Sequence, residues 1–255
     1  MYQPPPLFGS LVAFIIGTFL GSFANVCIYR LPRRQSVVFP GSHCPFCQQA
    51  IRPWQNIPLL SYAVLRGRCG ACTSPIAWRY PLVELGCGLL YVWLYHQLGL
   101  SAQSVVFALL ALTLVIVSWI DLAHTIIPDT ITLPGIMAGV CASVAITPVG
   151  LGNALIGIGL GGGLFFLVAV LSRGGMGGGD IKLIAMIGAF LGWRAVLVTI
   201  LLGALSGAIV GVALILLKQK RRKDPVPFGP FLALGALLAM VWGEELLAWY
   251  WHLPL

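Results

Sequence analysis

Residues 195 to 217 read AVLVTILLGALSGAIVGVALILL, a run of 23 residues without a charged side chain. A helix needs about 20 predominantly apolar residues to cross the hydrocarbon core of a bilayer. Of the 255 residues, 59% are hydrophobic and only 9% are charged, against about 25% in a soluble domain, so lipid is expected to be the main solvent. Such runs predict eight membrane spans, at about residues 8 to 28, 82 to 98, 104 to 120, 130 to 148, 151 to 171, 181 to 192, 195 to 217 and 229 to 250.

The predicted fold is therefore an all-α polytopic membrane protein with a polar loop near its N-terminus. We divide the chain into a transmembrane anchor (1–29), a loop domain (30–80) and a seven-helix membrane domain (81–255). The first span is expected to be retained, because Met1 to Leu7 lacks the basic residues of a signal peptide and no small-residue cleavage site follows. The short span at 181–192, and Pro134 within the fourth span, predict broken helices that line a cavity.

The basic residues, which give a formal charge of +8, predict the topology. Two loops hold most of them: Arg30, Arg33, Arg34, Arg52, Arg66, Arg68 and Arg79 in the first, and Lys218, Lys220, Arg221, Arg222 and Lys223 in the second. By the positive-inside rule both loops face the cytoplasm, which is consistent because an even number of predicted spans separates them. Arg173 and Lys182 also fall inside, so only Arg194 lies outside, and both termini are predicted to be periplasmic.

Glycines are abundant, and several recur at four-residue intervals, as at Gly159 and Gly163 and at Gly203, Gly207 and Gly211. This spacing lets the backbones of membrane helices approach closely. We interpret these glycines as helix-packing residues and assign them no chemistry.

Four of the seven cysteines form two Cys-x-x-Cys pairs in the first loop, Cys44 with Cys47 and Cys69 with Cys72. Each two-residue gap places both sulfurs on one side, and two such pairs make a tetrahedral thiolate site suited to zinc. Because four cysteines leave no open position, the metal is expected to be structural. The alternatives are a redox disulfide and, for one ligand, replacement by His43, which we interpret as a solvated neighbour.

Two aspartates lie at predicted span ends on the cytoplasmic side. Asp121 ends the third span, and Asp180 follows Gly177, Gly178 and Gly179 at the start of the sixth. Two neighbouring carboxyls in a medium of low dielectric constant share a proton, which leaves one as a base and the other as an acid. That pair could activate water and protonate a scissile amide, while the glycines admit an extended substrate backbone. The alternative is that Asp180 caps a helix and Asp121 is a solvated helix end.

The remaining ionisable residues have simpler interpretations. Asp129 competes with Asp121 as a catalytic carboxyl, but it follows Pro128 and precedes an apolar run, so we rank it second and interpret it as a helix N-cap. Glu84 is expected to pair with Arg79. Lys182 could stabilise the ionised form of Asp180, but we favour its extension to the membrane interface.

Several of these motifs together resemble those of the bacterial type IV prepilin peptidases, which are aspartyl proteases with a Gly-x-Gly-Asp motif. The resemblance covers most of the chain. It consists of Gly21 to Pro32, the two cysteine pairs, Arg79 to Leu85, Asp121 to Pro134, Gly177 to Leu183, and Pro227 to Pro230.

The resemblance implies an inner-membrane enzyme that removes the basic leader of type IV prepilins or type II secretion pseudopilins. It implies that Asp121 and Asp180 are the catalytic pair. Members with the cysteine loop also methylate the new N-terminal residue with S-adenosylmethionine, but the motif residues do not reveal that pocket. Glu84 and Asp129 are candidates for recognition of the leader.

Three other functions compete with this one. An ion-coupled transporter is the main alternative, because broken helices and intramembrane acids also describe carriers. A nucleic-acid module would need clustered stacking aromatic residues, which the basic loop lacks, so no nucleic-acid partner is expected. A serine protease is disfavoured, because Ser206 has neither the usual glycine spacing nor a clear histidine partner.

Overall fold

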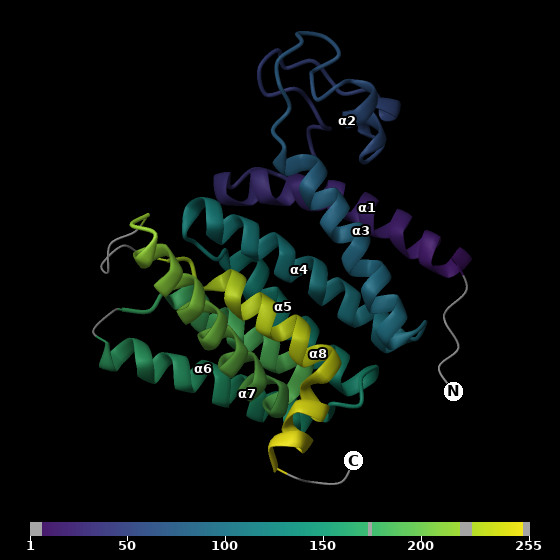
Figure 1. Cartoon of the computed structure of the whole chain (residues 1–255). Coiled ribbons are helices and arrows are strands. Elements are labelled where there is room, and N and C mark those ends of the chain that lie inside the picture. The colour runs from purple at the N-terminus through teal and green to yellow at the C-terminus, as the bar shows by residue number, and fades with distance from the viewer. Residues whose placement is uncertain (1–6, 173–174, 220–225, 252–255) are drawn as a thin grey trace. The chain divides into compact units, whose positions relative to one another are not determined.

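The computed structural model describes residues 7–172, 175–219 and 226–251, and it is almost entirely helical (Figure 1). Arg173, Lys220, Arg221, Arg222 and Lys223, which entered the topology prediction, lie outside these residues. The chain divides into two compact units, Met1–Ser104 and Val105–Leu255. Each unit is described by itself.

The first unit consists of two long helices and the loop that joins them. Helices α1 (Leu7–Arg30) and α3 (Arg79–Leu98) pack against each other, and the loop contains only the short elements η1 (Leu31–Arg33), η2 (Pro53–Asn56) and α2 (Leu60–Val64). Glycines set the close approach of the long helices. A Cβ at Gly17 would lie 2.6 Å from the Cys87 carbonyl oxygen, and one at Gly21 would lie 2.8 Å from the Glu84 Cα. Larger residues would push the helices apart.

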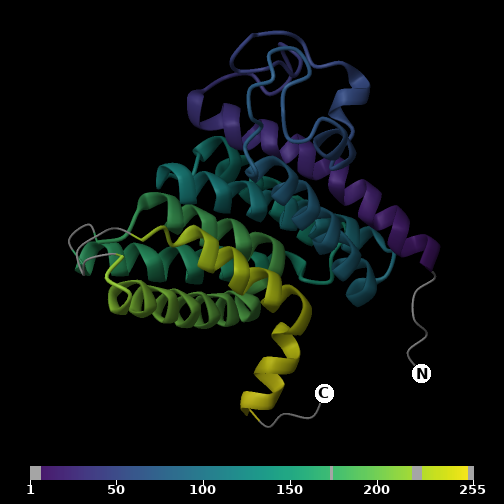
Figure 2. The ribbon, with the colours of Figure 1, turned by 45° about the horizontal axis from the view of Figure 1, so that its top comes forward.

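The second unit contains α5 (Asp129–Ala145), α6 (Gly150–Leu171), α7 (Gly178–Leu216), α8 (Gly229–Trp251) and most of α4 (Ala102–His124). Its long helices run side by side in Figure 2. Helix α7 packs against α5, α6 and α8. Its Leu183, Ile184, Met186 and Ile187 are completely buried. This burial explains why the first half of α7 is apolar on nearly every side.

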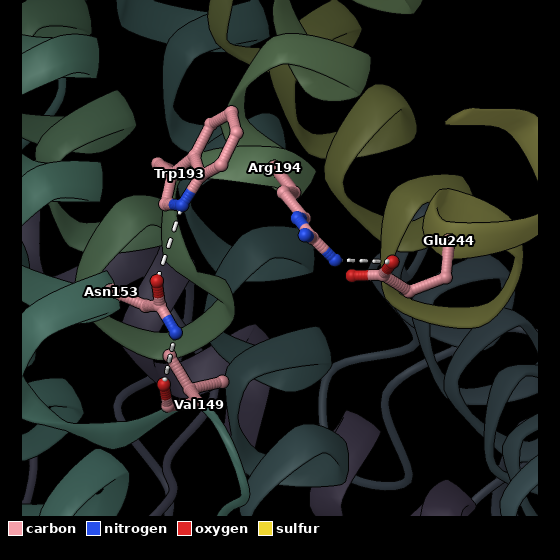
Figure 3. Close-up of polar contacts among 5 residues, drawn as sticks. All are labelled: Val149, Asn153, Trp193, Arg194 and Glu244. Carbon is pink, nitrogen blue, oxygen red and sulfur yellow. Dashed lines mark hydrogen bonds and ion pairs between the residues drawn. The ribbon is translucent and has the colours of Figure 1, made fainter. Parts of the chain in front are cut away.

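Helix α7 is interrupted at Gly192, where φ is 77° and ψ is 175°. Polar contacts flank the interruption (Figure 3): the Trp193 indole N–H donates to Asn153 Oδ1 over 3.2 Å, and Asn153 Nδ2 donates to the Val149 carbonyl over 2.9 Å. Arg194 pairs with Glu244 of α8 over 3.2 Å. The predicted break after residue 192 is therefore confirmed. The predicted break at Pro134 was wrong, because α5 continues through that residue.

Within the described residues, five helices are long and apolar enough to cross a bilayer: Leu7–Arg33, Ala102–His124, Gly150–Leu171, Gly178–Leu216 and Gly229–Tyr250. Two predicted spans are joined in α7, α5 is a shorter apolar helix, and α3 is more polar than the others. The all-α polytopic class is thus confirmed, and the number of eight spans stays a prediction.

The glycine prediction was only partly right. Among the described residues, nothing lies within 4 Å of a Cβ built at Gly159, Gly163 or Gly211, so these positions are not close contacts. The tightest approach of α6 and α7 instead joins Gly157 and Gly188, where a Cβ on Gly157 would lie 2.6 Å from the Gly188 carbonyl oxygen. Spacing alone did not identify the face that packs.

Candidate functional site

Asp121 lies in the last turn of α4 and is only 5% exposed. Its Oδ2 accepts a hydrogen bond of 2.9 Å from the backbone N–H of Gly229, the first residue of α8. The first N–H groups of a helix have no partner within the helix and favour a negative charge. Asp121 is therefore fixed by another helix, and the alternative of a solvated helix end is excluded.

Gly229 fits this contact because it has no side chain. A Cβ at this position would lie 2.8 Å from Asp121 Oδ2 and 3.3 Å from its Cγ. The sequence indicated the Pro227 to Pro230 motif but assigned it no contact. The available signal for a functional role of Gly229 was its position within the Pro227 to Pro230 motif, which resembles a family pattern.

Asp180 is half-buried in the first turn of α7. The N-cap of this helix is Gly177, whose carbonyl accepts the Asp180 N–H over 3.1 Å, so the alternative in which Asp180 is the cap residue is excluded. The glycines leave room around the carboxyl group, since a Cβ on Gly177 would lie 3.3 Å from Asp180 Oδ2.

The segments that carry the two aspartates meet through the loop between α4 and α5. Gly179 lies against Ile127, because a Cβ on Gly179 would lie 2.8 Å from the Ile127 Cβ. Thr125, two residues before Ile127, donates its N–H to the Asp121 carbonyl over 2.8 Å and adopts a positive φ of 53°. Asp121 is close enough for its charge to act on Asp180. The structure thus brings both predicted aspartates into one region of the second unit.

A second pair of charges lies near this region. Lys182 Nζ contacts both carboxylate oxygens of Asp129 at 2.7 Å, which ties the start of α5 to the start of α7. Lys182 therefore does not simply extend to the membrane interface, and the N-cap of α5 is Pro128 rather than Asp129. Both interpretations from the sequence were wrong.

The expected ion pair of Glu84 and Arg79 is absent from the described residues. Glu84 is 8% exposed and instead accepts the N–H of Leu59 over 2.8 Å. It thereby connects α3 to the loop before α2.

The four predicted zinc ligands form one cluster, in which all four sulfurs lie within 4.8 Å of one another. The two Cys-x-x-Cys segments are built alike. In each, the first cysteine donates its N–H to the carbonyl five residues later and accepts the N–H four residues later: Cys44 with Gln49 and Gln48, and Cys69 with Ser74 and Thr73. An antiparallel bridge closes each turn, between His43 and Ala50 and between Arg68 and Pro75.

This geometry fits a tetrahedral metal ion. With zinc–sulfur bonds of about 2.3 Å, neighbouring sulfurs lie about 3.8 Å apart. Cys44 Sγ and Cys72 Sγ are 3.9 Å apart, and all four cysteines are free. His43 is not part of the cluster, and its Nδ1 lies 3.0 Å from the Gly41 carbonyl oxygen.

The thiols of the cluster differ in acidity. Burial opposes ionisation of Cys44, but hydrogen bonds from the Cys47 and Phe46 amides and from Ser74 lower the pKa of its thiol to about 6. The Gln49 amide favours ionised Cys47, yet desolvation and the neighbouring sulfurs raise the pKa of Cys47 to about 11. Four adjacent thiolates need positive charge between them, which a divalent ion supplies.

Two families match the chain by sequence. The Bacterial Peptidase A24 N-terminal domain matches residues 15–98, and the Type IV leader peptidase family matches residues 108–212. No solved structure matches.

Similar proteins named prepilin leader peptidase/N-methyltransferase align over nearly the whole chain. The Stutzerimonas stutzeri protein is 36% identical over 273 residues, which cover 96% of this chain and 94% of the relative. The Aeromonas hydrophila protein is 38% identical over 275 residues (96% and 94%), and the Legionella pneumophila protein is 35% identical over 276 residues (96% and 95%). These names give the transporter alternative no support.

Proposed function

The chain belongs to the type IV leader peptidase family, and from this we infer that it cleaves the leader from type IV prepilins or type II secretion pseudopilins and methylates the new N-terminus. Relatives aligned over nearly the full chain carry both activities in their name. The single structural observation that supports the peptidase activity is the placement of Asp121 and Asp180 in one region of the second unit.

In the proposed mechanism the two carboxyl groups hold one proton between them. The ionised aspartate takes a proton from water as the water oxygen attacks the scissile carbonyl carbon. The protonated aspartate donates its proton to the carbonyl oxygen, and a proton then passes to the leaving amide nitrogen as the carbon–nitrogen bond breaks. The hydrogen bond from Gly229 fixes the orientation of Asp121 during this cycle.

The topology predicted from the basic loops places this chemistry at the cytoplasmic edge of the inner membrane, with both termini periplasmic. A prepilin carries a basic leader followed by an apolar helix, so its cleavage site lies at the same depth. The enzyme could reach that bond without moving the apolar helix into water.

Zinc is proposed to be structural, held by Cys44, Cys47, Cys69 and Cys72. The described loop has only three short helical elements between α1 and α3, so the metal would stabilise its fold. The methyl group would come from S-adenosylmethionine, whose positively charged sulfur makes the methyl carbon electrophilic.

The peptidase proposal is tested with the purified full-length protein and a prepilin in mixed micelles. Asp121→Asn and Asp180→Asn are expected to lower kcat/KM by at least about a hundredfold, as expected for the loss of a general acid or base. Asn caps a helix about as well as Asp, so Asp121→Asn should keep a near-wild-type melting temperature.

Glu245→Gln is the matched control, because Glu245 is an exposed carboxylate in α8, and it should cleave normally. Cleavage by either aspartate variant at the wild-type rate would contradict the proposed mechanism.

A further inference from the structure

A cavity of about 1110 Å³ lies in the first unit, between the cysteine loop and the adjoining ends of α1 and α3. All of its lining residues fall between Ser22 and Glu84, so the cavity belongs entirely to the first unit. Small-molecule sites typically measure roughly 300–1,000 Å³. The cavity therefore has room for a cofactor-sized ligand together with the end of a peptide.

Two buried polar atoms beside this cavity have no partner among the described residues. They are the Asn25 side-chain oxygen, which can only accept a hydrogen bond, and Arg79 Nε, which can only donate one. Both residues line the cavity. The Asn25 amide is held in place by its own hydrogen bond of 3.0 Å to the Tyr80 carbonyl. Unpaired buried polar groups are costly, so this arrangement indicates a ligand with both a donor and an acceptor.

The charges around the cavity restrict that ligand further. Four arginines and a single carboxylate, Glu84, are the formally charged side chains among the described residues that line it. Four arginines repel a basic leader peptide, so the leader does not fit here. A ligand that fits carries a carboxylate for Arg79 and a positive charge for Glu84.

Aromatic side chains complete the lining. Trp54 and Tyr62 line the cavity, and Tyr80 does so with its ring 5.2 Å from the Arg79 guanidinium carbon. Flat aromatic faces can stack on a nucleobase. One class of ligand, an amino-acid sulfonium nucleoside, combines these features: a nucleobase, a carboxylate, a hydrogen-bond donor and a localised positive charge.

We propose that this cavity binds S-adenosylmethionine, with its carboxylate at Arg79 and its sulfonium beside Glu84. This inference rests on the methyl-transfer half of the proposed function and assigns that half a site. The neutral amine of the new N-terminus attacks the methyl carbon, and the carbon–sulfur bond breaks with its electron pair left on sulfur. The amine then loses a proton to water, and S-adenosylhomocysteine remains.

The test measures equilibrium binding of radiolabelled S-adenosylmethionine to the zinc-loaded full-length protein in micelles. Arg79→Met should weaken binding by about tenfold or more, the effect of losing a charge-assisted hydrogen bond. Glu84→Gln should weaken S-adenosylmethionine by about tenfold but should barely change S-adenosylhomocysteine, which lacks the sulfonium charge. The amide of the Glu84→Gln variant would still offer an oxygen to the Leu59 N–H, so the fold should be retained.

Arg194→Met and Glu244→Gln are matched controls from the ion pair in the second unit, and neither should change the affinity. Zinc content and melting temperature report whether each variant folds. Wild-type affinity in folded Arg79→Met and Glu84→Gln proteins would overturn the assignment of the cavity. Equal weakening of both ligands by Glu84→Gln, or equally tight displacement by ATP, would overturn the chemistry assigned to it.

A direct map of the site comes from hydrogen exchange. S-adenosylmethionine should slow exchange in peptides that contain Asn25, Trp54 and Arg79, and protection only elsewhere would overturn the inference. A wild-type protein that cleaves prepilin but binds no S-adenosylmethionine would refute the methyl-transfer half of the proposed function. Binding and methylation that survive all cavity substitutions would refute this inference alone.

Discussion

Replacing Gly229 by alanine should damage catalysis without unfolding the protein. The added Cβ would lie 2.8 Å from Asp121 Oδ2, closer than such contacts occur, so the carboxylate must move away from the Gly229 N–H. The hydrogen bond that is now 2.9 Å long would then lengthen or break. A hydrogen bond to a charged group contributes about 1.5–3 kcal/mol. If the transition state needs the present orientation of Asp121, that amount corresponds to a loss in kcat/KM of about 10- to 150-fold.

The assay is cleavage of a purified prepilin, with the melting temperature measured on the same samples. Gly211→Ala is the matched control, because no described atom lies within 4 Å of a Cβ built there, and its kcat/KM should equal that of the wild type. Alanine is a better helix former than glycine, so neither variant should lose much stability through helix propensity. A wild-type kcat/KM in Gly229→Ala would show that this contact does not orient Asp121.

Cys47→Ser, or removal of zinc by a chelator, should release about one metal ion per chain and loosen the loop. Zinc content measures the first effect, and protease cleavage between residues 34 and 78 measures the second. Cys141→Ser lies outside the cluster and should cause neither effect. Lys182→Met should lower the unfolding free energy by less than about 1 kcal/mol, because the Lys182 and Asp129 side chains are 38% and 54% exposed. The double variant Lys182→Met/Asp129→Asn should lose little more stability than Lys182→Met alone. Fully additive losses of stability would mean that the two residues do not act as a pair. Gly192→Ala should destabilise the protein by about 1–3 kcal/mol, because Gly192 has a positive φ that alanine adopts only with strain. Gly152→Ala should be nearly neutral, because no described atom lies within 4 Å of a Cβ built there. Equal melting temperatures of the two variants would contradict this assignment of strain.

Local pattern was enough to predict the membrane class, the zinc ligands and the two aspartates as candidates. The four cysteines lie in one cluster, as their spacing predicted, because each pair belongs to a short segment that closes its own turn. Zinc binding by this cluster stays a prediction. The membrane helices could also be distinguished from the cysteine loop, because an apolar run of span length is recognised from the sequence without knowledge of which helix packs against it.

The errors arose where a residue's partner is distant or on another face. Arg79 and Glu84 are five residues apart, a spacing that does not place two side chains on the same face of a helix, and no ion pair forms between them in the described part of the chain. Lys182 pairs with Asp129, 53 residues away, and the glycines that pack α6 on α7 differ from those that the four-residue spacing selected.

Composition and short-range spacing were enough to identify a helical membrane protein with two cysteine pairs and two candidate catalytic carboxylates. The packing of the helices was needed to show that Gly229, 108 residues away, orients Asp121, and that Asn25 and Arg79 leave unpaired polar atoms beside a cavity. Hydrogen bonds act over about 3 Å, so their partners are known only once helix packing has brought distant segments together.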